Sequence, residues 1–120
     1  MARILIVEDE AEIRQVLQVA LGEAGHVVEE AHNGAQGLQC YAATPADLVI
    51  MDMRMPVMDG RQLILALRHR FPNTTILAVS GEPGLLDTAR ALHVQGTLQK
   101  PFTIMDLLKV VQKLLRPCGT

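Results

Sequence analysis

The sequence predicts an α/β protein built on a doubly wound parallel sheet, and three observations lead to this prediction. Short continuous apolar runs occur at 4–7, 48–51 and 76–79, which is the pattern of strands buried on both faces of a parallel sheet. Stretches with helical apolar spacing fill the gaps between these runs. The 120 residues suffice for one domain with its own core. Five strand–helix units in succession indicate helices on both sheet faces and right-handed crossovers.

The first half of the chain contains two complete strand–helix units. The run at 4–7 is the first strand, and residues 27–31 form a shorter second strand that we place near the sheet margin. Between them, apolar residues recur one helical turn apart, and Gly25 follows where a C-terminal cap is expected. Residues 35–43 then form the second helix. The apolar residues of the first helix are Ile13, Val16, Leu17, Ala20, Leu21 and Ala24.

The second half repeats this order three times. After the strand at 48–51, we expect Asp59 to cap the third helix and Gly60 to let the chain turn. A fourth strand at 76–79 precedes a short helix at 85–92. A short fifth strand then leads to a helix that opens with a capping box and carries an apolar face. Thr97 and Leu98 form that strand, Thr103 and Asp106 have capping-box spacing, and the apolar face consists of Ile104, Leu107, Leu108, Val111, Leu114 and Leu115.

Polar side chains stand where these apolar runs end. Glu8 and Asp9 follow the first strand, Asp52 ends the third, Ser80 ends the fourth, and Lys100 follows the fifth. Parallel strands end at the same edge of their sheet, and open α/β sheets bind ligands there. We therefore expect three carboxylates, a hydroxyl and an ammonium group to converge.

Three carboxylates close together favour a divalent cation, because they repel one another without one. Oxygen ligands suit octahedral Mg²⁺, and the absence of His or Cys beside them argues against Zn²⁺. We take Asp9 and Asp52 as direct ligands and expect Glu8, with its longer side chain, to reach the metal through water.

A hydroxyl and an ammonium beside a metal-bound carboxylate suit phosphoryl transfer, which needs positioning and charge neutralisation more than covalent chemistry. Lys100 and Ser80 are expected to contact phosphoryl oxygens. Asp52, alone at its strand end, is the candidate nucleophile that forms an acyl phosphate.

Four motifs in order resemble the receiver domain of bacterial response regulators in two-component systems, as in chemotaxis receivers. They lie at 6–10 (IVEDE), 51–60 (MDMRMPVMDG), 79–81 (VSG) and 100–102 (KPF), and the resemblance extends from Arg3 to Leu115. It implies a flavodoxin-like (βα)5 sheet with strand order 2-1-3-4-5. We assign 1–116 to the receiver domain and 117–120 to a tail or the start of a linker.

The resemblance also implies partners and residue roles. Asp52 would receive a phosphoryl group from the phosphohistidine of a sensor histidine kinase or a phosphotransfer protein. Mg²⁺ would be bound by Glu8, Asp9, Asp52 and the backbone carbonyl of Arg54. Lys100 would contact the phosphoryl group and precede a cis peptide bond, and Ser80 would be the switch hydroxyl.

The chain departs from the family pattern on the face formed by the fourth helix, fifth strand and fifth helix, through which receivers commonly reach effectors. Thr97 stands where receivers usually carry Tyr or Phe. His93 stands where a Gly is usual, so we expect that helix end to be frayed or differently capped. The segment 80–100 is about two residues short, which predicts a short or mobile fourth helix. Gln95-Gly96 replaces acidic residues of receivers that dimerise ahead of winged-helix domains.

Two residues flanking the site invite a further hypothesis. Arg54 and Glu82 stand two residues past Asp52 and Ser80. We expect them to modulate the lifetime of the phosphoryl group by screening Asp52 from the attacking water. One arrangement that would do this is an ion pair between the two side chains.

The favoured function is a phosphorylated switch that turns over no external substrate. Two alternative functions remain open. The first is a pseudo-receiver that serves only as an interaction scaffold with phosphorylation-independent partners, which the unusual Thr97 keeps open. The second is an Mg²⁺-dependent phosphohydrolase of similar fold. Such enzymes usually place an Asp two residues after the nucleophile, and Arg54 at that position argues against this class.

Composition argues against nucleic-acid-binding and membrane proteins. The net charge of −2, without a Lys/Arg run, gives no footprint for nucleic acid or a membrane surface. Two Phe, one Tyr and no Trp provide little base-stacking surface. No apolar run is long enough to span a bilayer. We expect a cytoplasmic protein in which Cys40 and Cys118 are separate thiols.

Overall fold

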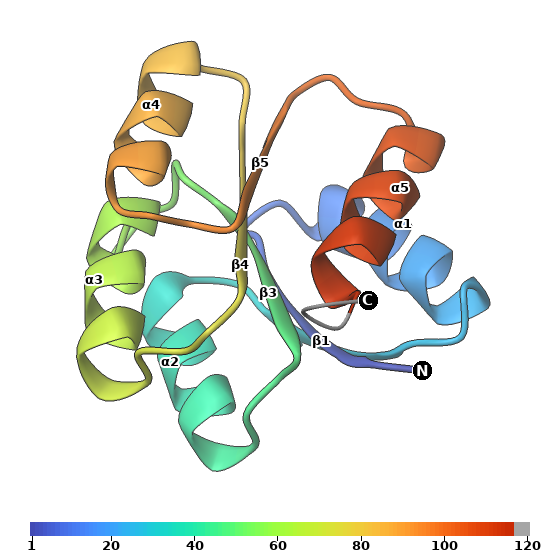
Figure 1. Cartoon of the computed structure of the whole chain (residues 1–120), viewed down its shortest axis with the longest axis horizontal. Coiled ribbons are helices and arrows are strands. Elements are labelled where there is room, and N and C mark those ends of the chain that lie inside the picture. Colours follow the sequence, from blue (N-terminus) through green and yellow to red (C-terminus); the bar gives the residue numbers. More distant parts are fainter. Residues whose placement is uncertain (117–120) are drawn as a thin grey trace.

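The computed structural model describes residues 1–116 as five strands and five helices that alternate along the chain (Figure 1). The strands form one parallel sheet in the order β2-β1-β3-β4-β5, which confirms the predicted fold class and strand order. The strands are β1 (Arg3–Val7), β2 (Val27–Ala31), β3 (Leu48–Asp52), β4 (Ile76–Ser80) and β5 (Gly96–Gln99). The helices are α1 (Ala11–Glu23), α2 (Gly34–Ala43), α3 (Gly60–Arg70), α4 (Pro83–Ala91) and α5 (Ile104–Leu115). Residues 117–120, assigned above to a tail or linker, lie outside the described residues.

The helices cover both faces of the sheet. Figure 1 shows α2, α3 and α4 on one side and α1 and α5 on the other. Alternate residues of each central strand point to opposite faces, so β1 gives Leu5 and Val7 to one core and Ile4 and Ile6 to the other. Strands buried on both sides need apolar residues at every position, which explains the continuous apolar runs. β2 lies at the sheet margin, as predicted.

The strand register places the carboxyl ends of four strands at one edge. Val7 pairs with Met51 on β3, and the next residue of β3, Asp52, pairs with Val79 on β4. Ser80, at the end of β4, pairs with Gln99, the residue before Lys100. The polar residues that end or follow these strands are therefore brought together by backbone pairing.

The predicted caps are present at two helix starts. The Asp59 side chain accepts a hydrogen bond from the Gln62 N–H at 2.9 Å, and Thr103 accepts one from the Asp106 N–H at 3.0 Å. Both helix starts are capping boxes, because the side chains of Gln62 and Asp106 in turn accept hydrogen bonds from the backbone N–H groups of Asp59 and Thr103. Gly60 has a different role from the one predicted. A Cβ at Gly60 would lie 2.6 Å from the Met53 Cα, so close backbone approach, and not a turn conformation, requires glycine.

The expectation of a frayed or unusual end to α4 is wrong. His93 adopts the left-handed conformation, with φ of 63°. Its N–H donates to the Arg90 carbonyl, and the Val94 N–H donates to the Ala89 carbonyl. These two bonds form a Schellman motif in which His93 occupies the position usually taken by Gly. The helix itself is short, as predicted, with nine residues.

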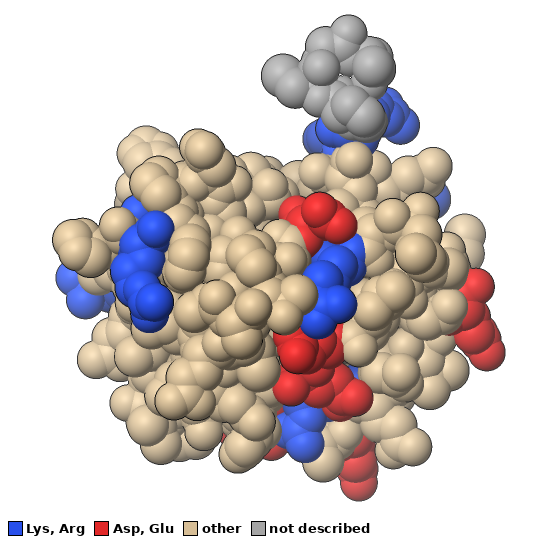
Figure 2. Space-filling view, turned by 90° about the horizontal axis from the view of Figure 1, so that it is seen from below, with Lys and Arg blue, Asp and Glu red and all other residues tan. Residues whose placement is uncertain are grey.

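Charged side chains do not gather by sign on the face drawn in Figure 2. Acidic and basic side chains form a mixed stripe through its centre, and other charged groups stand separately near the margin. That face therefore presents no single-sign field to a partner.

Within residues 1–116, no helix is long and apolar enough to cross a membrane.

Candidate functional site

A cleft of about 440 Å³ lies at the carboxyl edge of the sheet. Glu8 and Ser80 are each 2% exposed and Asp52 is 8% exposed, so three polar side chains are held away from bulk water beside it. We call this feature the strand-end cleft. Its lining residues are Asp9, Glu10, Asp52, Arg54, Met55, Pro56, Ser80, Gly81, Glu82 and Lys100.

The acidic residues predicted as metal ligands form one cluster. Glu8, Asp9 and Asp52 each place a carboxylate oxygen within 4.8 Å of the other two. Glu8 and Asp52 are buried, whereas Asp9 is exposed. A donor set made only of carboxylate oxygens suits a hard cation such as Mg²⁺ or Ca²⁺ better than a transition metal.

Lys100 binds both buried carboxylates. Its Nζ donates to Asp52 Oδ2 at 2.9 Å and to Glu8 Oε1 at 3.1 Å. The Lys100 N–H donates to the Ser80 carbonyl, and the Lys100-Pro101 peptide bond is cis, as the resemblance implied. Burial disfavours the charged ammonium, but the hydrogen bonds to Asp52 and Glu8 and the attraction of their charges together outweigh burial, so the pKa of Lys100 lies above its ordinary value.

The surroundings of Glu8 disfavour the charged form of its carboxyl group. Burial, together with the neighbouring Asp52 carboxyl group, raises the pKa of Glu8 to about 8, although Lys100 opposes the shift. Its second oxygen, Oε2, is buried without a hydrogen-bond partner among the described residues. A buried oxygen in this state is expected to have a partner. The cluster therefore fits a cation that would bind where Glu8 and Asp52 meet.

Backbone N–H groups bind two side chains of the cleft. The Arg54 N–H donates to Asp52 Oδ1 at 3.1 Å, and the Glu82 N–H donates to the Ser80 hydroxyl at 3.0 Å. As an acceptor in this bond, the Ser80 oxygen keeps its own proton for another partner. The predicted binding of a metal by the Arg54 carbonyl stays a prediction.

The mouth of the cleft carries the ion pair considered in the sequence analysis. Arg54 Nη2 lies 2.5 Å from Glu82 Oε1, with both side chains largely exposed. Arg54 follows β3 and Glu82 is the N-cap residue of α4, so the pair links two loops that flank Asp52.

Thr97 does not belong to this cleft. Its hydroxyl accepts a hydrogen bond from Arg90 Nη2 at 3.0 Å, and Arg90 also pairs with Asp87 at 2.9 Å. The structure therefore joins Glu8, Asp9, Asp52, Ser80, Lys100, Arg54 and Glu82 in one site, and it leaves Thr97 in a separate polar contact between α4 and β5.

Sequence reasoning missed Arg14. Its Nη1 donates to the carbonyl oxygens of Glu8 and Asp9 at 2.8 and 3.2 Å, and its Nε lies 3.6 Å from Glu30. Arg14 thus holds the backbone that carries two of the acidic residues. The available signal was a cation in the first turns of the helix that follows Glu8 and Asp9.

The chain matches proteins of one family. The response regulator receiver domain matches residues 4–112. The transcriptional regulatory protein PcoR of Escherichia coli is 36% identical over 118 residues, which cover 97% of this chain and 52% of PcoR, so the chain spans about half of that relative. The DNA-binding transcriptional regulator NtrC of Escherichia coli is 33% identical over 92% of this chain and 24% of NtrC.

Solved structures agree with this match. The chemotaxis protein CheY4 of Vibrio cholerae superposes with a TM-score of 0.89 and 35% identity, covering 95% of this chain and 98% of CheY4. The response regulator TrrA of Thermotoga maritima, solved in complex with Mg²⁺-BeF, has a TM-score of 0.88 and 29% identity over 95% of this chain and 99% of TrrA. The chain belongs to the receiver domain family of two-component response regulators.

Proposed function

We propose that this chain is a phosphorylation switch in which Asp52 accepts a phosphoryl group from a phosphohistidine of a sensor histidine kinase or phosphotransfer protein. The observation that carries the proposal is the contact of Lys100 Nζ with both Asp52 and Glu8, beside the unpartnered Glu8 Oε2. The cationic ammonium and the unsatisfied carboxylate oxygen are arranged around the one carboxylate that ends β3.

In the transfer, a carboxylate oxygen of Asp52 attacks the phosphorus atom, the P–N bond breaks, and the histidine nitrogen keeps the bonding electrons. The protein must position these groups and neutralise charge on the phosphoryl oxygens. Lys100 is within hydrogen-bonding reach of the attacking carboxylate. The Ser80 hydroxyl lines the same cleft and has a proton to donate to a phosphoryl oxygen.

Glu8, Asp9 and Asp52, with the Arg54 carbonyl, would hold Mg²⁺. When bound, Mg²⁺ supplies positive charge that polarises a phosphoryl oxygen and offsets the repulsion between the carboxylates. The Mg²⁺-BeF complex of TrrA supports this choice of metal by similarity.

As a switch, the chain would catalyse only its own phosphorylation and dephosphorylation and would turn over no external substrate. We propose a cytoplasmic location, an effector that recognises the α4–β5–α5 face, and no direct contact of this domain with nucleic acid. The relatives that are transcriptional regulators are about twice as long or longer, so their activities as whole proteins are not transferred to this chain.

A scaffold without phosphorylation is the second candidate, and Thr97 favours it. The Thr97 hydroxyl is engaged by Arg90, apart from the strand-end cleft. A scaffold would bind its partners equally well with and without phosphorylation of Asp52.

The first experiment is intact mass spectrometry after incubation with acetyl phosphate and Mg²⁺. We expect one added phosphoryl group in the wild type and in Asp59→Asn, a matched change at the helix cap outside the cleft. Asp52→Asn, and wild type with EDTA, should gain none. A wild type that gains no mass and also forms no beryllofluoride complex would favour the scaffold.

The Arg54–Glu82 ion pair is proposed to modulate how long the phosphoryl group persists. Its two side chains stand at the cleft mouth, where they can restrict the approach of water to Asp52. We expect Arg54→Ala to change the autodephosphorylation rate several-fold. If the pair acts as a unit, Glu82→Ala and the double variant should have the same rate as Arg54→Ala. An unchanged rate in Arg54→Ala would refute the proposal.

A further inference from the structure

Arg14, near the start of α1, donates hydrogen bonds to the backbone of the two acidic residues that follow β1. Its Nη1 lies 2.8 Å from the Glu8 carbonyl oxygen and 3.2 Å from the Asp9 carbonyl oxygen. Within residues 1–116, no backbone N–H donates to either oxygen. Both carbonyl groups therefore depend on the Arg14 guanidinium for a donor from the protein.

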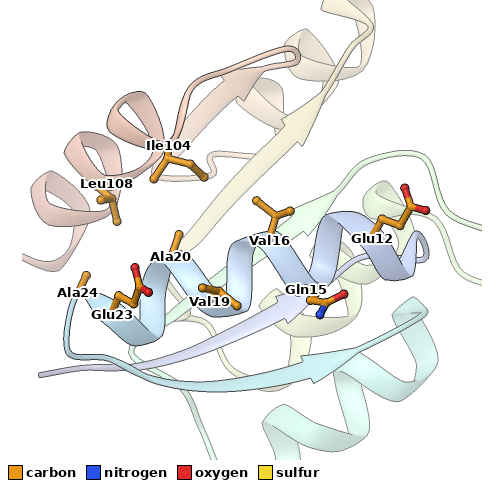
Figure 3. A pocket seen from close by; sticks show the side chains of 9 residues that line it. All are labelled: Glu12, Gln15, Val16, Val19, Ala20, Glu23, Ala24, Ile104 and Leu108. Carbon is orange, nitrogen blue, oxygen red and sulfur yellow. The ribbon is translucent and has the colours of Figure 1, made fainter.

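Arg14 reaches this backbone from the side of α1 that faces β2. Figure 3 shows the other side of the helix, where Val16 and Ala20 point toward α5 across a groove of about 710 Å³. Arg14 and Val16 are two positions apart, so their side chains leave the helix in nearly opposite directions. The Arg14 Nε lies 3.6 Å from Glu30 of β2. Arg14 thus joins α1, β2 and the acidic loop, and it takes no part in the surface between α1 and α5.

The two bonds from Arg14 hold a bend on which the acidic cluster depends. Neighbouring side chains of a strand point to opposite faces of the sheet. Glu8 and Asp9 are neighbours, yet each places a carboxylate oxygen within 4.8 Å of the other and of Asp52. The chain bends at Asp9, and this bend also lets one nitrogen atom reach two successive carbonyl oxygens. Arg14 therefore binds the backbone at the point where the carboxylates are brought together.

The two acidic residues differ in how they are held. The Glu8 N–H donates to the Ala31 carbonyl at 3.0 Å, so the backbone of Glu8 is fixed on both sides. The Asp9 side chain is exposed and takes part in no ion pair within residues 1–116. The direction of the Asp9 carboxylate is therefore set by its backbone, which Arg14 holds.

We propose that Arg14 is a positioning residue that makes the strand-end cleft selective for Mg²⁺ over Ca²⁺, by holding Glu8 and Asp9 in the bend that brings their carboxylates together. This inference rests on the proposed binding of Mg²⁺ in the cleft. Mg²⁺ demands nearly ideal octahedral geometry, whereas Ca²⁺ accepts flexible and irregular sets of oxygen ligands. A looser bend should therefore weaken the binding of Mg²⁺ more than the binding of Ca²⁺.

The positive charge of Arg14 has the opposite effect from its hydrogen bonds. A fixed cation beside the cleft repels any bound metal ion, so loss of the charge alone would strengthen the binding of both metals equally. Arg14→Lys keeps the charge, but a single ammonium group lacks the planar set of donors that reaches both carbonyl oxygens and Glu30. Arg14→Met removes the charge together with the hydrogen bonds. Because both metals are divalent, the ratio of their affinities depends on the geometry of the site and is insensitive to the charge.

The test is an NMR titration of the ¹⁵N-labelled chain with MgCl₂ or CaCl₂, without phosphodonor. The signals followed are the backbone N–H groups of Arg54 and Glu82, which donate to side chains of the cleft. We expect Arg14→Lys to bind Mg²⁺ roughly tenfold more weakly than the wild type, with its Ca²⁺ affinity changed by less than about threefold. Arg14→Met should also lose more affinity for Mg²⁺ than for Ca²⁺.

Arg61→Met is the matched control, because Arg61 is an exposed arginine on α3 outside the cleft. It should change neither affinity. The same spectra show whether each variant is folded, and Arg14→Lys alone decides the question if Arg14→Met does not fold.

Two results would overturn the proposal while leaving the metal site intact. They are an unchanged ratio of Mg²⁺ to Ca²⁺ affinity in Arg14→Lys, or tighter binding of both metals by Arg14→Met with wild-type affinities in Arg14→Lys. A wild type that binds neither cation would overturn the metal site and this inference together. A shifted ratio in a chain that gains no phosphoryl group would support the role of Arg14 and refute only the proposed switch.

Discussion

Glu8 carries an electrostatic penalty that the other residues of the strand-end cleft relieve only in part. Lys100 pairs with one of its oxygens, while the other is buried without a partner among the described residues. A buried carboxyl group beside Asp52 therefore favours its protonated form when no cation is bound. The position of Glu8 therefore suits the binding of a cation and lowers the stability of the fold when none is bound.

The raised pKa of Glu8 predicts a pH dependence of stability. Unfolding lowers this pKa from about 8 to 4.5. Between these values the folded protein keeps a proton that the unfolded chain releases, so the contribution of Glu8 to the free energy of unfolding falls as pH rises. We expect wild type in EDTA to lose stability relative to Glu8→Gln from pH 4.5 to about 8, with no further change above.

Urea denaturation at a series of pH values measures this difference. Other titrating groups are common to both proteins and largely cancel in the comparison. Added Mg²⁺ should reduce the loss, since a cation favours the charged carboxylate. Parallel pH profiles for the two proteins would contradict the prediction.

Val57 shows backbone strain at the level of a single residue. It has φ of 70° and an exposed side chain in the loop after β3. A left-handed conformation is costly for a β-branched residue and almost free for Gly. We expect Val57→Gly to increase the free energy of unfolding by about 1 kcal/mol. Val19→Gly, within helix α1, should lower it by about 0.5 kcal/mol, and thermal denaturation distinguishes the two.

At the scale of elements, Arg68 joins α3 to the segments that precede β4 and β5. Its guanidinium donates to the carbonyl oxygens of Pro72, Thr74 and His93 and to the Gln95 side chain. Gln95 also accepts the Ile76 N–H at 2.8 Å. Gln95 thus completes a hydrogen-bond network at the amino edge of β4.

Loss of this network should destabilise the fold. We expect Arg68→Ala to lower the free energy of unfolding by about 2 kcal/mol, because backbone carbonyls lose a charged donor. Arg68→Lys should recover only part of this, since an ammonium group cannot span the same acceptors. Arg61→Ala, an exposed change on the same helix without a hydrogen bond in the described part of the chain, is the control. Equal midpoints in urea for Arg68→Ala and Arg61→Ala would contradict the prediction.

At the scale of the whole molecule, close contacts fix how the helices sit against the sheet. A Cβ at Gly60 would lie 2.6 Å from the Met53 Cα, and one at Gly37 would lie 2.8 Å from Val7 Cγ2. These glycines let the start of α3 approach the loop after β3, and let α2 approach β1. The loop that follows Asp52 is held by this packing.

Two Gly→Ala changes test the packing. Gly60→Ala should lower the free energy of unfolding by about 2 kcal/mol, because the Met53 backbone cannot move without disturbing β3. Gly22→Ala, in α1, has no atom within 4 Å of the new Cβ and should raise it by about 0.5–1 kcal/mol. Calorimetry of both variants gives the comparison, and a destabilised Gly22→Ala would contradict the packing argument.

The fold and most of the candidate site could be predicted from residue order. Helix caps at Asp59 and Thr103 depend on residues three positions apart, so local chemistry was enough. The conformation of His93 could not be predicted in this way. Its left-handed backbone is stabilised by its own hydrogen bonds to Arg90 and Arg68 and by the bond from the Val94 N–H to the Ala89 carbonyl, which together outweigh the intrinsic preference of the residue.

The sequence by itself determined the parallel sheet, its strand ends and the set of acidic, hydroxyl and ammonium groups gathered there. These follow from apolar periodicity and from the rule that parallel strands end at one edge. Only the tertiary structure decided that Glu8 has an oxygen without a partner, that Arg14 holds the acidic loop, and that Thr97 pairs with Arg90. Those outcomes depend on distances between side chains far apart in the chain, which only packing determines.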